Sequence, residues 1–157
     1  MFRLMAAATA SAASLPEYIA KYTPAVGRLA RAVLEKMRER LPGAVELVYD
    51  NYNALVVGFG PSERASDAVF SIALYPRWVN LFFLNGVGLP DPHRLLRGQG
   101  KQVRSIKLLD PATLDIPAVR ELMARALERA DPPLDGDGPG RMVIKSISPK
   151  QRPRRPA

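Results

Sequence analysis

Residues 68–84 read AVFSIALYPRWVNLFFL, two apolar runs that a proline and an arginine separate. The first run alternates Phe70, Ile72 and Leu74 with the residues between them, which is typical of a β-strand. Two strands joined by so short a turn must be antiparallel, because a parallel return needs a crossover of a dozen or more residues. This stretch therefore predicts an antiparallel strand pair.

Three more strands are expected around this pair, at Val45–Tyr49, Ala54–Phe59 and Val103–Leu109. Runs of strands without intervening helices indicate an α+β fold. We predict an antiparallel β-sheet of about five to six strands, flanked by an N-terminal and a C-terminal helix.

Helices are expected on both sides of the strand region. Thr23-Pro24 begins a helix whose apolar residues run from Val26 to Leu41, since threonine caps a first turn and proline fits the first helical position. Pro42-Gly43 ends it. A short helical piece precedes it at Leu15–Tyr22, and Asp115 with Pro117 begins a last helix.

The composition divides the chain into segments. We expect a disordered leader at 1–14, an α+β domain at 15–130, a Gly/Pro linker at 131–140, an extra strand at 141–148 and a basic mobile tail at 149–157. An alternative interpretation of the leader is a short export or transit signal. In the extra strand, Met142, Val143, Ile144 and Ile147 supply apolar side chains that a docked strand would bury.

The composition also limits the chemistry. There is no cysteine, which excludes disulfide scaffolds, thiol nucleophiles and zinc–cysteine sites, and His93 is the only histidine. The net charge of +8 favours anionic partners. No apolar stretch approaches the roughly 18 residues of a membrane-spanning helix. We expect a cytoplasmic protein with no membrane association and no cofactor.

Several short motifs resemble those of the YdhG-like domain family. They are Leu41-Pro42-Gly43-Ala44-Val45-Glu46 with Tyr49, and the segment Trp78–Leu109 with Val79-Asn80-Leu81-Phe82-Phe83, Asn85-Gly86, Asp91-Pro92, Gly98-Gln99-Gly100-Lys101 and Ile106-Lys107-Leu108. The resemblance covers Leu15–Ala130. It implies an α+β fold with flanking helices and no established reaction. The family is loosely labelled frataxin-like or iron chaperone, which implies iron binding as one alternative function.

The glycine-lysine loop Gly98-Gln99-Gly100-Lys101, with Arg104, is a candidate anion site. Glycines let backbone amides approach an anion, and Lys101 and Arg104 supply positive charge. The loop lacks the spacing of a P-loop and precedes a strand rather than a helix. The alternative interpretation is a tight turn into the next strand.

Aromatic residues at strand ends form a second candidate site. Tyr49, Tyr52, Tyr75 and Trp78 would line a ligand groove against one face of the sheet. Alternatively, they cap the edge of the core with their polar atoms in water.

The basic tail is a candidate nucleic-acid arm. Its cationic residues are Lys150, Arg152, Arg154 and Arg155. Arginines in such segments enter the negative minor groove of DNA. A solubilising tail is the alternative, and nucleic acid is the less favoured partner.

Neither a catalytic nor a metal site is predicted. The serines lie in no nucleophile motif, and the carboxylates Glu46 and Asp50 fit no catalytic spacing. The first long helix carries mainly basic residues, which disfavours an iron site there. We expect a non-enzymatic domain that binds a small anionic or apolar ligand, or a protein partner, through the sheet and the Gly98–Arg104 loop. An iron chaperone and a nucleic-acid accessory protein are the alternatives, and a homodimer is one option for the assembly.

Overall fold

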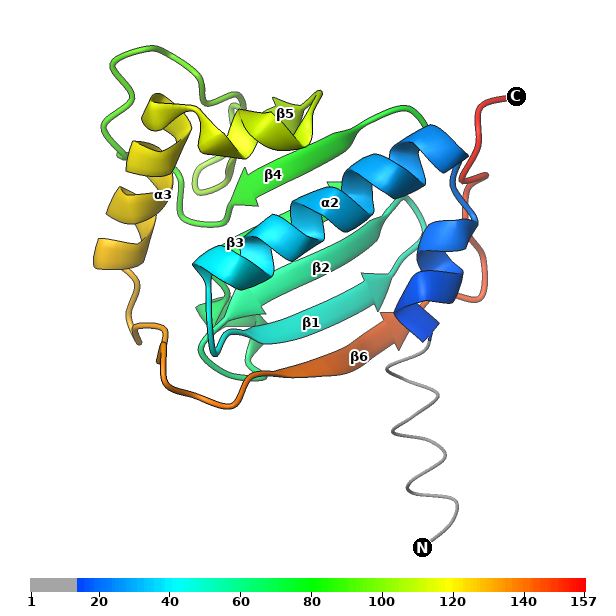
Figure 1. Ribbon diagram of the computed structural model, residues 1–157, viewed down its shortest axis with the longest axis horizontal. Coiled ribbons are helices and arrows are strands. Elements are labelled where there is room, and N and C mark those ends of the chain that lie inside the picture. Colours follow the sequence, from blue (N-terminus) through cyan, green and yellow to red (C-terminus); the bar gives the residue numbers. More distant parts are fainter. Residues whose placement is uncertain (1–13) are drawn as a thin grey trace, which may run out of the picture.

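A computed structural model describes residues 14–157 as helices that cover one side of a six-stranded sheet (Figure 1). The spatial order of the strands is β5-β4-β3-β2-β1-β6. The strands are β1 (Val45–Asp50), β2 (Leu55–Gly60), β3 (Phe70–Leu74), β4 (Val79–Phe83), β5 (Arg104–Leu108) and β6 (Arg141–Ile147). The helices are residues 14–20, α2 (Pro24–Arg40) and α3 (Pro117–Glu128), with short 3₁₀ turns η1 (Ala65–Asp67) and η2 (Pro111–Asp115). The predicted α+β class is confirmed.

The sheet is mixed rather than wholly antiparallel, which corrects the sequence prediction. Strands β1 to β5 form an antiparallel meander, but β6 runs parallel to β1, with Arg141 beside Val45. The cause is the linker at 131–140. It packs against the turn that begins β1, where a Cβ on Gly43 would lie 2.2 Å from the Asp135 carbonyl oxygen. The chain therefore enters β6 from the end at which β1 starts.

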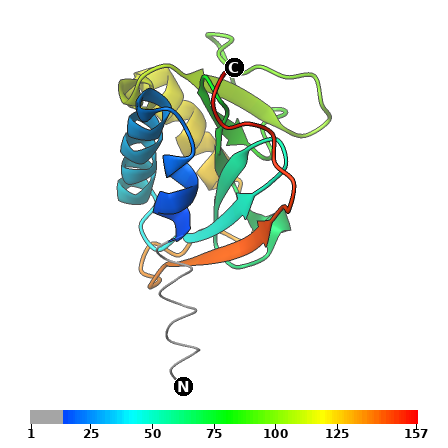
Figure 2. The same ribbon diagram turned by 90° about the vertical axis from the view of Figure 1, so that its right-hand side faces the viewer.

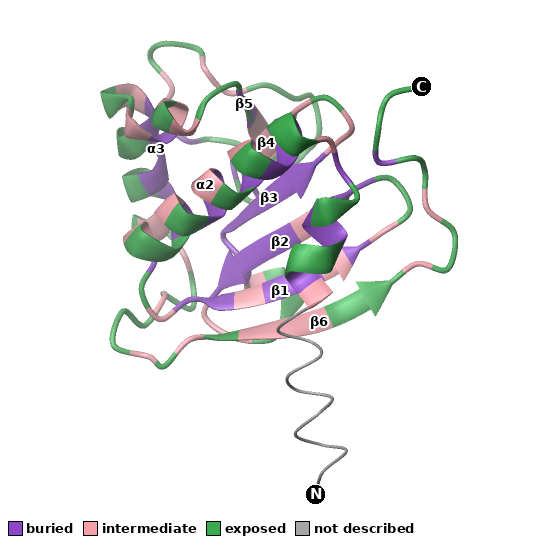
Figure 3. Ribbon diagram, turned by 45° about the vertical axis from the view of Figure 1, so that its right-hand side comes forward, coloured by how far each residue is buried: buried purple, intermediate pink, exposed green. Residues whose placement is uncertain are grey.

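The core lies between the helices and one face of the sheet (Figure 3). Thr23 caps α2 by accepting a hydrogen bond from the amide of Val26, as its position before Pro24 predicts. The apolar stripe of α2 is buried against the strands, and Ala30, Val33 and Met37 are fully inaccessible. Within residues 14–157, no helix combines the length and the apolar character that crossing a bilayer requires.

Tyr22 joins the helical layer to the sheet. Its hydroxyl accepts from the amide of Leu55 at 3.1 Å and donates to the carbonyl of Leu74 at 2.9 Å. Leu55 and Leu74 are opposite each other in the β2–β3 pair, so the hydroxyl is inserted at the end of that ladder. Both backbone groups are thereby satisfied inside the core.

The expected start of the last helix is displaced. Helix α3 begins at Pro117 with Ile116 at its N-cap, and Asp115 makes no cap. Asp115 instead accepts hydrogen bonds from Lys36 and Arg40 of α2, which holds η2 against that helix. A carboxylate between two lysine or arginine side chains is more stabilised than one at an exposed helix start.

The predicted extra strand is present, because β6 pairs with β1 from Arg141 to Ile147, with a register shift that leaves Lys145 without a partner in β1. The segment 149–157, predicted to be a mobile tail, differs from that expectation. It lies against the end of β1, and Arg154 is only 6% exposed. Apart from Ser14, the predicted leader at 1–14 lies outside the described residues.

Candidate functional site

No helix within residues 14–157 covers the second face of the sheet. Figure 2 shows the helices of the described chain on the opposite side. Because strand side chains alternate between the two faces, the neighbours of core residues such as Val48, Ile72 and Leu81 belong to this second face. We call it the open face and define it by Tyr49, Val56, Tyr75, Trp78, Asn80, Phe82 and Lys107.

The loop between β2 and β3 covers the part of the open face that lies near the start of β1. A Cβ on Gly58 would lie 3.9 Å from the Cβ of Ala68, so the chain after β2 folds back over the strand. Glu63 in this loop forms an ion pair with Arg141 at 3.2 Å, and its carbonyl accepts from Lys145 at 3.2 Å. The loop thus leaves accessible the part of the sheet that carries the aromatic residues.

A stacked aromatic pair lies at the other end of the open face. The Tyr75 and Trp78 ring centroids are 5.3 Å apart at 24°, and both residues are half-buried. The turn between β3 and β4 brings them together, since the Tyr75 amide donates to the Trp78 carbonyl at 2.9 Å. The Lys107 ammonium lies 4.8 Å from the Trp78 centroid and is exposed. An exposed cation on a fixed aromatic surface is the main chemical feature of this face.

Polar atoms on the open face are few. Asn80 lies between Trp78 and Phe82 on β4, and its Oδ1 is buried with no hydrogen-bond donor among the described residues. Burial raises the pKa of Tyr49, so its hydroxyl stays neutral at physiological pH.

The Gly98–Arg104 loop does not join this site. Trp78 and the loop lie near opposite ends of β4, about 17 Å apart at the usual rise per strand residue. The Arg104 guanidinium donates to the carbonyls of Gly100 at 2.7 Å and Val103 at 2.8 Å, so its charge closes the loop. Lys101 is exposed, and Gly98 adopts φ +130°, a backbone conformation that favours glycine. The geometry matches the tight-turn interpretation.

The basic tail lies against the domain. Arg154 donates to Asp50, and Arg155 donates to the Lys21 carbonyl at 3.1 Å. The Arg152 guanidinium lies 5.8 Å from the ring of Tyr52, a residue in the turn between β1 and β2. Two of the four candidate nucleic-acid residues, Arg154 and Arg155, therefore have side chains bound to the domain. The other two, Lys150 and Arg152, are exposed, and within the described structure their side chains form no ion pair and no hydrogen bond to a carbonyl.

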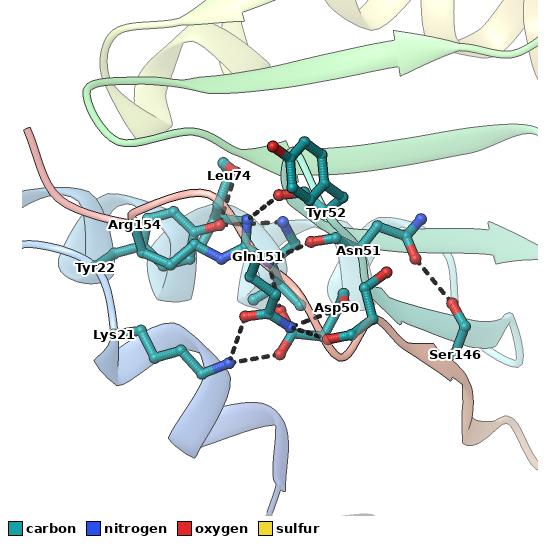
Figure 4. A network of polar contacts seen from close by, with 11 residues as sticks. Lys21, Tyr22, Asp50, Asn51, Tyr52, Leu74, Ser146, Gln151 and Arg154 are labelled. Carbon is teal, nitrogen blue, oxygen red and sulfur yellow. Dashed lines mark hydrogen bonds and ion pairs between the residues drawn. The ribbon is translucent and has the colours of Figure 1, made fainter.

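A buried polar network centred on Asp50 was not predicted (Figure 4). Asp50 is inaccessible to solvent and accepts from Lys21 at 2.7 Å and from Arg154 at 2.9 Å. Gln151 accepts from Lys21 at 3.0 Å and donates to the Asp50 carbonyl at 3.1 Å. The Arg154 guanidinium also lies 5.7 Å from the Tyr22 ring. The network fastens the end of β1 to the first helix and to the tail.

Burial of Asp50 favours its neutral form, but the hydrogen bonds from Lys21 and Arg154 outweigh that effect and hold the pKa of the carboxyl below its ordinary value. Asp50 is therefore a charged structural group rather than a proton donor. Burial likewise raises the pKa of Tyr22. Sequence spacing carried no signal for this network, because the partners of Asp50 lie 29 to 104 residues away from it in the chain.

The carboxylates on the helical side are held by cations. Glu46 accepts two hydrogen bonds from Arg38, at 2.8 and 2.9 Å. Asp115 is bound by Lys36 and Arg40. In residues 14–157, no cluster of three or more aspartate, glutamate, histidine or cysteine side chains is arranged to hold a metal ion.

The structure thus places Tyr49 and Trp78 on one face and puts Tyr52, the glycine loop and the tail elsewhere. The sequence analysis did not predict three further residues of that face, which are Asn80, Phe82 and Lys107. The alternation of side chains along their strands could have identified them. In comparisons with known proteins, no family model, no curated protein and no solved structure matches this chain.

Proposed function

We propose that this protein is a cytoplasmic, non-catalytic binding module whose open face docks an acidic protein. The observation that carries the proposal is the Tyr75–Trp78 stack with Lys107 above it, on a sheet face that no helix of the described residues covers. Tyrosine and tryptophan supply much of the binding energy in protein interfaces, because large rigid rings bury area at low entropic cost.

The charge of the open face supports an acidic partner. Its seven residues include one cation and no carboxylate. Arg77 in the adjoining turn is exposed, and the whole chain carries +8. A partner with surface aspartates and glutamates would be steered to this face and held beside Lys107.

The shape of the open face supports a protein rather than a small molecule. Small ligands bind in concave pockets that enclose most of their surface. Five cavities in the described chain measure about 200 to 510 Å³ and are lined by other residues, at the helix side and at the rims of the sheet. Neither Trp78 nor Lys107 lines any of these.

The test is site-specific photocross-linking in cells of the source organism. A photoreactive benzoylphenylalanine replaces Val56 on the open face, and the cross-linked peptide is sequenced by mass spectrometry. We expect an adduct with one protein, on a segment rich in aspartate and glutamate, which disappears when Lys107→Glu is added. The matched control carries the same group at Glu39, which is exposed on α2.

Calorimetry with the purified partner completes the test. We expect Trp78→Ala to weaken binding at least tenfold, about 1.4 kcal/mol or more, as for an aromatic hot spot. The proposal fails if the Val56 adduct is no more abundant than the Glu39 adduct, if Lys107→Glu leaves it unchanged, or if Trp78→Ala binds as the wild type does.

A further inference from the structure

Arg97 lies beside the open face, although it belongs to no strand. It forms an isolated antiparallel bridge with Ser105 of β5, in which the amide of each residue donates to the carbonyl of the other at 2.8 Å. Directly opposite residues of an antiparallel pair project to the same face of a sheet. Ser105 is also opposite Phe82, a residue of the open face. The Arg97 side chain therefore projects to the same side of the sheet as Lys107.

The loop before β5 holds Arg97 in place. The Asp91 carboxylate accepts from the amides of Leu95 and Leu96, both at 2.9 Å, which fixes the chain immediately before Arg97. The Arg97 guanidinium donates to the Arg94 carbonyl at 3.0 Å through one nitrogen, Nη1. Arginine has five N–H donors, so the others are available to a partner. An exposed cation that is held in advance loses little conformational entropy when it binds.

The described chain does not neutralise Arg97 or Lys107. Both residues are exposed, and within residues 14–157 their side chains contact the Arg94 carbonyl and the Trp78 ring rather than a carboxylate. Arg38, by contrast, is paired with a glutamate on the helical side. Two unpaired cations on one side of a sheet repel each other, and carboxylates of a partner would remove that repulsion.

Arg97, Lys107 and Trp78 lie on one diagonal of the sheet. Lys107 is two residues after Ser105 on β5, so it is a diagonal neighbour of Arg97. Trp78 stands in the same relation to Lys107, because Lys107 is opposite Asn80 and Trp78 is two residues before Asn80 in the chain. Diagonal neighbours are about 7–8 Å apart. Two cations and a stacked aromatic residue thus follow one another at equal steps.

An extended peptide presents side chains at nearly the same interval. Alternate residues of a β-strand project to one side and are about 6.4–6.8 Å apart. Residues four apart on a helix, which share a side, are separated by about 6 Å along its axis. The extended chain therefore matches the diagonal more closely, and the length of the arginine and lysine side chains covers the remaining difference.

We propose that the open face binds an extended segment of its partner with acidic residues at two alternate positions and an apolar residue at the next alternate position. The outer carboxylate pairs with Arg97, the inner carboxylate pairs with Lys107, and the apolar side chain covers Trp78. This inference rests on the proposed function, since it names the segment of the acidic partner that the open face recognises. The three positions form a line, so the segment can follow it in either chain direction.

Selection from a random peptide library tests the spacing. Peptides displayed on phage are selected on the immobilised full-length protein, and we expect enriched sequences with acidic residues two positions apart and an apolar residue two positions beyond. Reselection on Arg97→Glu should exchange the outer acidic residue for lysine or arginine and retain the inner one. Lys101→Glu is the matched control, because it reverses an exposed charge at the tip of the same loop, midway between Arg97 and Ser105.

Calorimetry with the peptide most enriched on the wild type gives a second measurement. We expect Arg97→Glu to weaken binding by about 10-fold or more and Lys101→Glu by less than about twofold at about 0.15 M salt, where separated surface charges are largely screened. Urea unfolding checks that both variants fold. We expect wild-type midpoints, because the bridge at Arg97 uses backbone atoms.

The outcomes separate this inference from the proposed function. If acidic peptides are enriched without the two-residue spacing, for example with the three- or four-residue spacing of a helix, the inference is overturned and the proposed function stands. The same holds if Arg97→Glu and Lys101→Glu select the same peptides and bind them equally. If no acidic peptide is enriched, or if Lys107→Glu selects the same peptides as the wild type, the proposed function fails and this inference fails with it.

Discussion

The Tyr22 hydroxyl hydrogen-bonds to backbone groups of two neighbouring strands, β2 and β3. It satisfies the Leu55 amide and the Leu74 carbonyl in the core. We expect Tyr22→Phe to lower the free energy of unfolding by about 1–3 kcal/mol, because it leaves buried backbone groups without a partner. Urea unfolding measures the change. Tyr52→Phe, at a residue 49% exposed, is the control and should alter stability little; equal values for both variants would contradict the role of the hydroxyl.

Asp50 is a buried charge that is stabilised by its ion pairs with Lys21 and Arg154. We expect Asp50→Asn to destabilise the protein by about 3–5 kcal/mol, because Arg154 then keeps its buried charge without a counter-ion. Glu46→Gln removes the exposed ion pair with Arg38 and should have an effect below about 1 kcal/mol. Chemical denaturation at pH 7 compares the two. A smaller effect for Asp50→Asn than for Glu46→Gln would refute this account.

The pH dependence of stability follows from the same carboxyl. Its pKa is lower in the folded state than in the unfolded state, where it is about 4. The stabilisation is therefore complete above that unfolded value and is lost as the pH falls through the folded pKa. We expect urea midpoints to decline below about pH 4, with a shallower decline for Asp50→Asn. Parallel declines for both proteins would assign the acid sensitivity to other groups.

At the scale of the element, β6 depends on the linker that delivers it. Gly43 has φ +79°, and a Cβ there would collide with the Asp135 carbonyl oxygen at 2.2 Å. We expect Gly43→Ala to lower stability by about 1–3 kcal/mol and to speed hydrogen exchange in β6. Gly100→Ala is the matched control, since nothing lies within 4 Å of the added Cβ. If β6 amides exchange alike in both variants, the linker does not position the strand.

The elements were largely predictable because their signals are local. Short apolar runs between turn residues, with period-2 alternation at Phe70, Ile72 and Leu74, predicted the strands from Val45 to Leu108, and Thr23-Pro24 marked the start of α2. The direction of β6 was not predictable, since it depends on where a linker packs and not on the strand's own residues. Trp78 was a candidate from its position alone, whereas its stacking with Tyr75 and Lys107 needed the register of three strands. The Asp50 network joins residues too distant in sequence for any spacing rule.

For the whole molecule, the segment 149–157 completes the fold. Removing residues 152–157 takes away Arg154 and, among the described residues, leaves Asp50 with the ion pair to Lys21. We expect this truncation to lower the melting temperature by at least about 10 °C, as loss of a buried charge partner implies. Removing only residues 156–157, which are exposed, should leave it unchanged. Equal melting temperatures in calorimetry would show that the tail contributes nothing to the domain.

The parallel pairing of β1 with β6 has a kinetic consequence. Strands β1 to β5 are neighbours in sequence and can assemble by successive hairpins, whereas β6 must close a loop of about 90 residues before it reaches β1. During refolding, β1 therefore spends an interval as a bare edge that another molecule can occupy. Recovery of native protein after dilution from denaturant should fall as the chain concentration rises, and the last step to a protected sheet should be the arrival of β6.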